Sequence, residues 1–141
     1  MKKTALLLML VFAGFFLKAQ TSPNSAPTAT ADPFAKLLEF KNAEYDFGKI
    51  TLGKAVSYVV EIKNISNETI TLENAHAGCG CTTPNFTPNQ KFAPGETVKV
   101  TIQFNGSVSG TFTRFTDINF SNGLTKQTKF TGEGIAAPPQ Q

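Results

Sequence analysis

VSYVVEIK at residues 56–63 and VKVTIQF at residues 98–104 alternate apolar with polar side chains. Successive side chains of a β-strand point to opposite faces, so this period of two gives each segment one apolar face and one polar face. Both stretches are also rich in Val and Ile, which favour strands. The two segments therefore predict two β-strands that bury one face in a core.

Further strands are expected on both sides of this pair. Short turn signals rich in Gly, Asn and Pro separate segments of Thr, Val, Ile and Phe, and no ten-residue helical periodicity competes with them. About seven strands in about 100 residues favour an all-β, immunoglobulin-like sandwich over a barrel. The five additional strands are expected at residues 38–40, 44–47, 69–75, 112–120 and 126–131.

Seven ordered motifs in this region resemble the domain of unknown function 1573 family, a bacterial envelope family. The resemblance implies an Ig-like β-sandwich similar to Hydin-type ASH and PapD-like domains, and an exported location. Its distinctive Cys-Gly-Cys-Thr motif falls on residues 79–82. The matching segments are YDFGKI with Gly53, IKN at 62–64, CGCT at 79–82, PGE at 94–96, GTF at 110–112, SN at 121–122 and TG at 131–132.

The N-terminal residues have the three parts of a secretory signal peptide. Lys2 and Lys3 precede an apolar run that is too short to span a membrane, and a small-residue exit ends at Ala19. We therefore expect export to the periplasm or the extracellular space, without stable membrane insertion after cleavage. The expected organisation is a signal peptide at 1–19, a flexible Ser/Thr/Pro-rich linker at 20–36, the sandwich at 37–135 and a disordered tail at 136–141.

The net charge of +3 belongs to the predicted signal peptide. Cleavage after Ala19 removes three lysines and leaves ten basic against ten acidic residues. Nucleic-acid binding needs a basic surplus or a basic stripe, so we expect no nucleic-acid partner. The partner expected instead is an unknown envelope or secreted protein.

Cys79 and Cys81 are the two cysteines of the chain and are separated by one glycine. Three interpretations remain open: a closed disulfide in an oxidising compartment, a pair active in thiol–disulfide exchange, and a Cu(I) site completed by His76. Positions i and i+2 of an extended strand lie about 6.5 to 7 Å apart, so a disulfide requires the chain to bend at Gly80. No cofactor is expected, with Cu(I) as the alternative.

The segment TTPNFTPNQKFAP at residues 82–94 is long for a loop in a compact sandwich. Phe86 and Phe92 in this loop are candidate partner-binding residues, and the other interpretation is that both rings cap the core. Known catalytic signatures are absent, since the chain has a single histidine and no nucleophile elbow. The sequence thus predicts a non-enzymatic binding or structural module, with a small redox or Cu(I) protein as the alternative.

Overall fold

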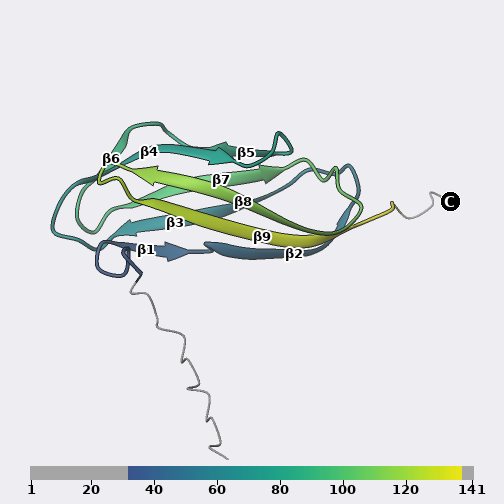
Figure 1. Ribbon diagram of the computed structural model, residues 1–141, viewed down its shortest axis with the longest axis horizontal. Coiled ribbons are helices and arrows are strands. Elements are labelled where there is room, and N and C mark those ends of the chain that lie inside the picture. The colour runs from purple at the N-terminus through teal and green to yellow at the C-terminus, as the bar shows by residue number, and fades with distance from the viewer. Residues whose placement is uncertain (1–31, 138–141) are drawn as a thin grey trace, which may run out of the picture. The chain divides into compact units, whose positions relative to one another are not determined.

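A computed structural model describes residues 32–137, and these residues form two β-sheets packed face to face (Figure 1). The predicted signal peptide at 1–19, residues 20–31 of the linker and residues 138–141 of the tail lie outside the described residues. Within 32–137 there is no helix long and apolar enough to cross a membrane. The predicted all-β sandwich is confirmed.

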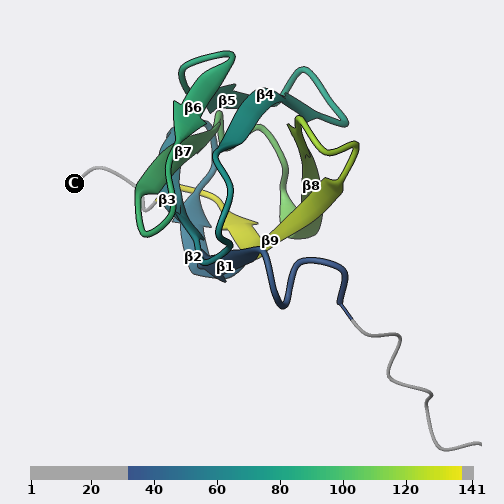
Figure 2. The same ribbon diagram turned by 90° about the vertical axis from the view of Figure 1, so that its left-hand side faces the viewer.

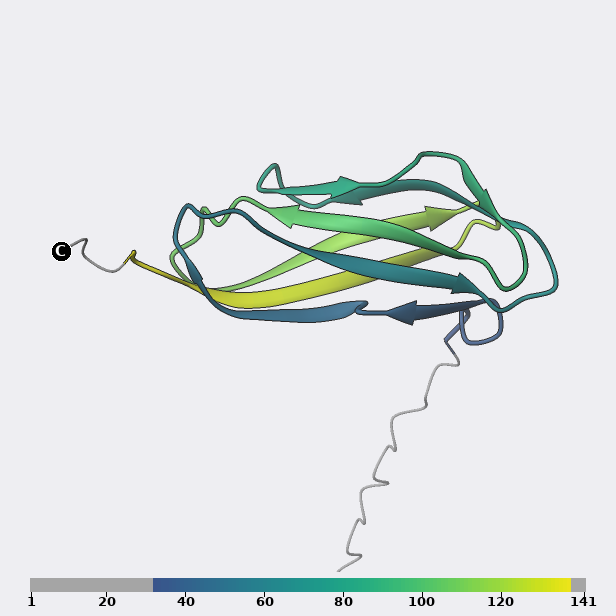
Figure 3. The same ribbon diagram turned by 180° about the vertical axis from the view of Figure 1, so that it is seen from behind.

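Sheet A has the order β1-β3-β7-β5, and sheet B has the order β2-β9-β8-β4-β6. Neighbouring strands are antiparallel except β2 and β9, which are parallel. Figure 2 shows the two layers end on, and Figure 3 shows the same sandwich from behind. The strands are β1 (Leu38–Lys41), β2 (Glu44–Thr51), β3 (Val56–Asn64), β4 (Ile70–Ala77), β5 (Thr82–Asn85), β6 (Gln90–Phe92), β7 (Thr97–Phe104), β8 (Gly110–Phe120) and β9 (Thr125–Ile135).

All seven predicted strands are present, and the structure adds β5 and β6 inside the segment that the sequence predicted to be a loop. These two strands were missed because they are short and because Pro84 interrupts the β5 segment. β2 also extends beyond its predicted end at Phe47. Gly48, with φ of 63°, forms a bulge within the strand there and not a turn after it.

The core lies between the sheets and contains many phenylalanine rings. Phe34 belongs to this core, since its side chain is 5% exposed and its ring lies 5.4 Å from that of Phe40. Asp32 accepts a hydrogen bond from the Phe34 backbone N–H and pairs with Lys126, which holds this segment against sheet B. The ordered domain therefore begins before residue 37, and the predicted linker boundary is too late.

Asn64, at the end of β3, is fully buried and joins the two sheets. Its Nδ2 donates to the carbonyl oxygens of Glu68 at 2.7 Å and Phe92 at 3.0 Å. Its Oδ1 accepts from the backbone N–H and the hydroxyl of Ser66. The amide thus fixes the turn after β3 in sheet A and connects it to β6 in sheet B.

Two glycines at the other end of the sandwich allow loops to pass very close to other backbone. A Cβ atom on Gly134 in β9 would overlap the carbonyl oxygen of Val108 in the β7–β8 loop. A Cβ atom on Gly106, where φ is +71°, would overlap the carbonyl oxygen of Lys54. This end is therefore closed by backbone contacts that tolerate only glycine.

Replacement of Asn64 by Ala should destabilise the domain by about 3 kcal/mol, because it leaves buried carbonyl groups without a hydrogen-bond donor. Chemical denaturation of the two purified proteins measures the change. Asn67→Ala in the same turn is the matched control, since Asn67 is exposed, and it should change stability by less than about 0.5 kcal/mol. Equal stability of the Asn64 variant and wild type would contradict this role of Asn64.

Replacement of Gly134 by Ala should cost about 3 kcal/mol, because the new methyl group displaces the loop at Val108. Gly78→Ala is the control, since Gly78 has no positive φ and a Cβ atom added to it would have no other atom within 4 Å. Thermal unfolding of both variants compares them directly. A Gly134 variant as stable as the Gly78 variant would show that the loop adjusts freely.

Candidate functional site

The turn at residues 78–81, called here the Cys turn, connects β4 of sheet B to β5 of sheet A. Cys79 and Cys81 form a disulfide across it, with a Cα–Cα distance of 5.3 Å. This distance is shorter than the separation in an extended strand, as the sequence interpretation required. Of the three interpretations left open, the closed disulfide is the state that the structure contains.

Thr82, at the start of β5, is in contact with both sulfurs. Its side chain is 5% exposed, and its Oγ1 lies 3.7 Å from the Cys79 sulfur and 3.8 Å from the Cys81 sulfur. The two cysteines themselves are half-buried. The disulfide therefore contacts a buried hydroxyl and remains partly accessible to solvent.

β8 runs beside the Cys turn and supplies its other neighbours. The backbone N–H of Gly78 donates to the carbonyl oxygen of Phe115 at 3.4 Å, which extends the β4–β8 register by one residue. The Phe115 side chain is 44% exposed on the outer face of sheet B. Arg114, the residue before Phe115 in β8, donates from Nη1 to the Thr113 carbonyl oxygen at 2.9 Å, and its Nε is buried without a hydrogen-bond partner.

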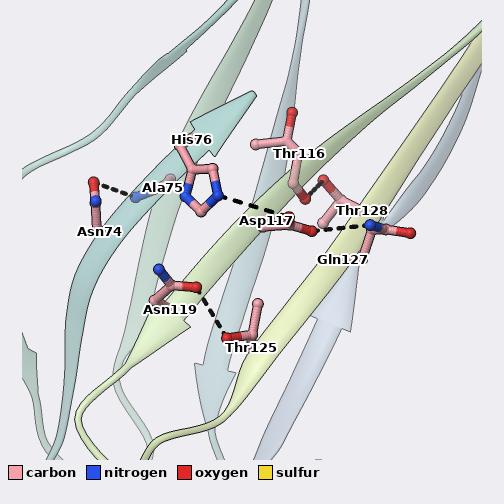
Figure 4. A network of polar contacts seen from close by, with 9 residues as sticks. All are labelled: Asn74, Ala75, His76, Thr116, Asp117, Asn119, Thr125, Gln127 and Thr128. Atoms are coloured by element: carbon pink, nitrogen blue, oxygen red, sulfur yellow. Dashed lines mark hydrogen bonds and ion pairs between the residues drawn. The ribbon is translucent and has the colours of Figure 1, made fainter. Parts of the chain in front are cut away.

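His76 lies on the same outer face, two residues before Gly78. Its Nε2 is 3.7 Å from Asp117 Oδ2, and Asp117 Oδ1 accepts a hydrogen bond from Gln127 Nε2 at 3.0 Å. Figure 4 shows these side chains crossing the face from β4 through β8 to β9, with the Asn119–Thr125 hydrogen bond beside them. The sheet register thus builds a polar row next to the Cys turn.

The structure does not gather His76, Cys79 and Cys81 as metal ligands. Among residues 32–137, no group of three or more His, Cys, Asp or Glu side chains has an arrangement that could hold a metal ion. His76 pairs with Asp117, and both sulfurs are committed to the disulfide. A Cu(I) site would require reduction of the disulfide and movement of the imidazole.

The two phenylalanines predicted to bind a partner lie away from the Cys turn. β5 carries the chain back along the sandwich, so Phe92 in β6 lies opposite Ile70 at the other end of β4. Phe92 is 1% exposed and packs in the core, so its side chain presents no surface to a partner. Phe86 is half-buried against the same core. The core-capping interpretation therefore holds for Phe92, while a contact role for Phe86 stays a prediction.

The groups with shifted pKa values lie outside the Cys turn. The Lys99 ammonium, followed by that of Lys41, lowers the pKa of Glu61 on the outer face of sheet A. Burial raises the pKa of Tyr58 in the core. The Phe34 backbone N–H, followed by the Lys126 ammonium, lowers the pKa of Asp32. These shifts therefore come from contacts and burial elsewhere in the domain and not from the Cys turn.

Comparison with solved structures supports the fold assignment. An ASH/PapD-like domain of human CEP192 superposes with a TM-score of 0.58 at 15% identity, over 76% of this chain and 91% of that chain. A protein of unknown function from Porphyromonas gingivalis W83 gives a TM-score of 0.60 at 15% identity, over 69% of this chain and 46% of that one. The secreted serine protease VesC from Vibrio cholerae gives a TM-score of 0.59 at 16% identity, over 74% of this chain and 24% of that chain.

At these identities the likeness shows the fold alone, and the chain spans less than half of the Porphyromonas protein and about a quarter of VesC. No curated protein matches the chain significantly. The family described as "Protein of unknown function (DUF1573)" matches residues 38–135, which is more than half of the chain and includes the Cys turn. The protein therefore belongs to the DUF1573 family.

Proposed function

We propose that the protein is an exported, non-enzymatic module of the bacterial cell envelope that binds another protein through the outer face of sheet B. The surface consists of His76, Phe115 and Asp117, beside the Cys turn, and is called here the β4–β8 face. The exposed ring of Phe115 is the observation that carries the proposal.

A phenylalanine at this position does nothing for the core. Side chains of β8 alternate between core and solvent, and Thr116 and Ile118 are buried while Phe115 points outward. Aromatic side chains surrounded by polar groups are typical anchors of protein interfaces. Phe115 has this surrounding, because Asp117 and His76 lie next to it on the same face.

The outer face of sheet A has a different character. Glu61 forms ion pairs with Lys41 and Lys99, both at 3.4 Å. Such exposed ion pairs keep a surface solvated and contribute little binding energy. Exposed ion pairs also occur on sheet B, where Lys129 pairs with Glu44 at 2.9 Å. The exposed ring of Phe115 is therefore the feature that favours the β4–β8 face for partner binding.

Two further features support an exported location. The sequence of residues 1–19 has the pattern of a cleaved signal peptide. The Cys79–Cys81 bond also fits an oxidising compartment, because disulfides persist outside the cytoplasm and are rare inside it. Partner and protein would therefore meet in the periplasm or outside the cell.

Site-specific photocrosslinking in the producing bacterium tests the β4–β8 face. A photoreactive residue at Thr113, which is exposed on β8 near Phe115, should give one discrete protein adduct. Adding Phe115→Ser should abolish this adduct, because the anchor of the interface is removed. The matched control is a photoreactive residue at Gln103, which is exposed on the outer face of sheet A and should give no adduct.

An adduct from Thr113 that persists with Phe115→Ser, or the same adducts from Gln103, would contradict the proposal. Folding of each variant is checked by thermal unfolding before crosslinking. Phe115→Ser should leave the melting temperature nearly unchanged, since the ring is exposed.

Cell fractionation with intact-mass measurement tests export. The protein should be found in the periplasmic or extracellular fraction, with a mass that corresponds to a chain starting at Gln20. Replacement of Lys2 and Lys3 by Glu should retain the precursor in the cytoplasm, because the positive n-region is lost. A full-length protein in the cytoplasm of the unmodified strain would overturn the exported location.

A further inference from the structure

We propose that the Cys79–Cys81 disulfide is exchangeable and forms a mixed disulfide with a cysteine of the bound protein. The partner is then an extracytoplasmic protein with an accessible thiol. This inference rests on the proposed function, because it names the chemistry by which the same partner is held.

The bridge contributes little that the fold needs. A disulfide stabilises by restricting the unfolded chain, and the restriction is small here because a single residue separates the two cysteines. The segments on both sides are already fixed, since β4 pairs with β8 and β5 pairs with β7. The sandwich can therefore keep its strands when this bond opens.

The hydroxyl of Thr82 stabilises the state in which the Cys79–Cys81 disulfide is open. Among the hydrogen bonds of residues 32–137, the two sulfur contacts at 3.7 and 3.8 Å are the ones that its buried hydroxyl makes. Disulfide sulfur is a weak acceptor, whereas a thiolate is charged and accepts a strong hydrogen bond. The hydroxyl lies about equally far from both sulfurs, so it can stabilise whichever one leaves as a thiolate.

Arg114 adds a positive charge on the neighbouring strand. It precedes Phe115, whose carbonyl oxygen accepts the hydrogen bond from Gly78 at the start of the Cys turn. Its Nε is buried without a partner in the disulfide state. Positive groups near a cysteine lower the pKa of its thiol and make the thiolate a better leaving group.

The Cys turn is partly exposed to solvent. Gly78 and Gly80 are exposed, neither has a positive φ, and no atom lies within 4 Å of a Cβ position on either. The fold thus does not require glycine at these positions, and the two cysteines beside them are half-buried. Because the Phe115 carbonyl oxygen accepts a hydrogen bond from Gly78, a protein docked on Phe115 lies next to the Cys turn.

The exchange step conserves atoms and electrons. A thiol of the partner loses its proton to solvent, and the resulting thiolate attacks one sulfur of the disulfide. The new intermolecular S–S bond forms as the Cys79–Cys81 bond breaks, and its electron pair leaves on the other sulfur as a thiolate beside Thr82 Oγ1. No external oxidant is needed, because one disulfide replaces another.

Glutathione serves as the probe thiol in the test. The mature protein is equilibrated with reduced and oxidised glutathione at pH 7, quenched with acid and analysed by intact mass. We expect a mixed disulfide with glutathione and a fully reduced form, both in the folded protein. A disulfide that remains closed until the protein is unfolded would overturn the proposal.

Alkylation of the reduced protein as a function of pH isolates the role of Thr82. Thr82→Val should reduce the thiolate fraction at pH 7 about tenfold, which corresponds to a thiol pKa raised by about one unit. Thr82→Ser keeps the hydroxyl and should retain the wild-type profile. Thr116→Val is the matched control, because Thr116 is also buried and its hydroxyl has no hydrogen-bond partner.

Identical pH profiles for the Thr82→Val and Thr116→Val variants would contradict the role of Thr82. The Cys79→Ser/Cys81→Ser double variant separates the two proposals. In this variant we expect the exchange with glutathione to be lost and the Thr113 photoadduct to be retained. A missing photoadduct in the wild-type protein, with glutathione exchange intact, would overturn partner binding and leave the exchange chemistry standing.

Discussion

The buried amide of Asn64 is the interaction on which the rest of the sandwich depends. It ties the end of β3 in sheet A to the carbonyl oxygen of Phe92 in sheet B and closes the turn to Ser66. A polar group without exposure needs all its partners, so the spacing of the two sheets at this end is set by hydrogen bonds as well as by packing. β6 is held in this way, and β4 pairs with it before reaching the Cys turn.

The sequence predicted the fold wherever one physical signal was strong. The alternating segments of β3 and β7 pair with each other over eight positions, from Val56–Phe104 to Lys63–Thr97. β5 and β6 were missed because three or four residues show no periodicity, and Pro84 argues against a strand. Pro84 is tolerated because β5 is an edge strand of sheet A. The close contact at Gly134 was also beyond prediction, since it depends on where the Val108 loop lies.

Only part of the candidate site could be predicted from the sequence. The Cys-Gly-Cys spacing identified the turn, but nothing adjacent in the chain marked Phe115 or Arg114, which come from another strand. One signal was present in the β8 sequence. Phe112, Ile118 and Phe120 are an even number of residues apart and so point to the same, buried face, whereas Phe115 falls on the opposite face. An apolar residue on the polar phase of a strand is thus a practical indicator of a functional surface. The sequence also could not show that His76 lies 3.7 Å from Asp117 on the neighbouring strand, and its role as a Cu(I) ligand stays a prediction.

The parallel pairing of β2 with β9 has a consequence for how the chain folds. Glu44 pairs with Lys129, so β2 can join sheet B only after β9 has been synthesised. Such contacts between distant parts of a chain form slowly, because a long loop must be ordered first. Until β9 is available, β8 lacks its longest neighbour and β2 has no partner in its sheet. Sheet B can therefore be completed only after synthesis has reached Ile135, the last residue of β9, whereas every strand of sheet A precedes residue 105.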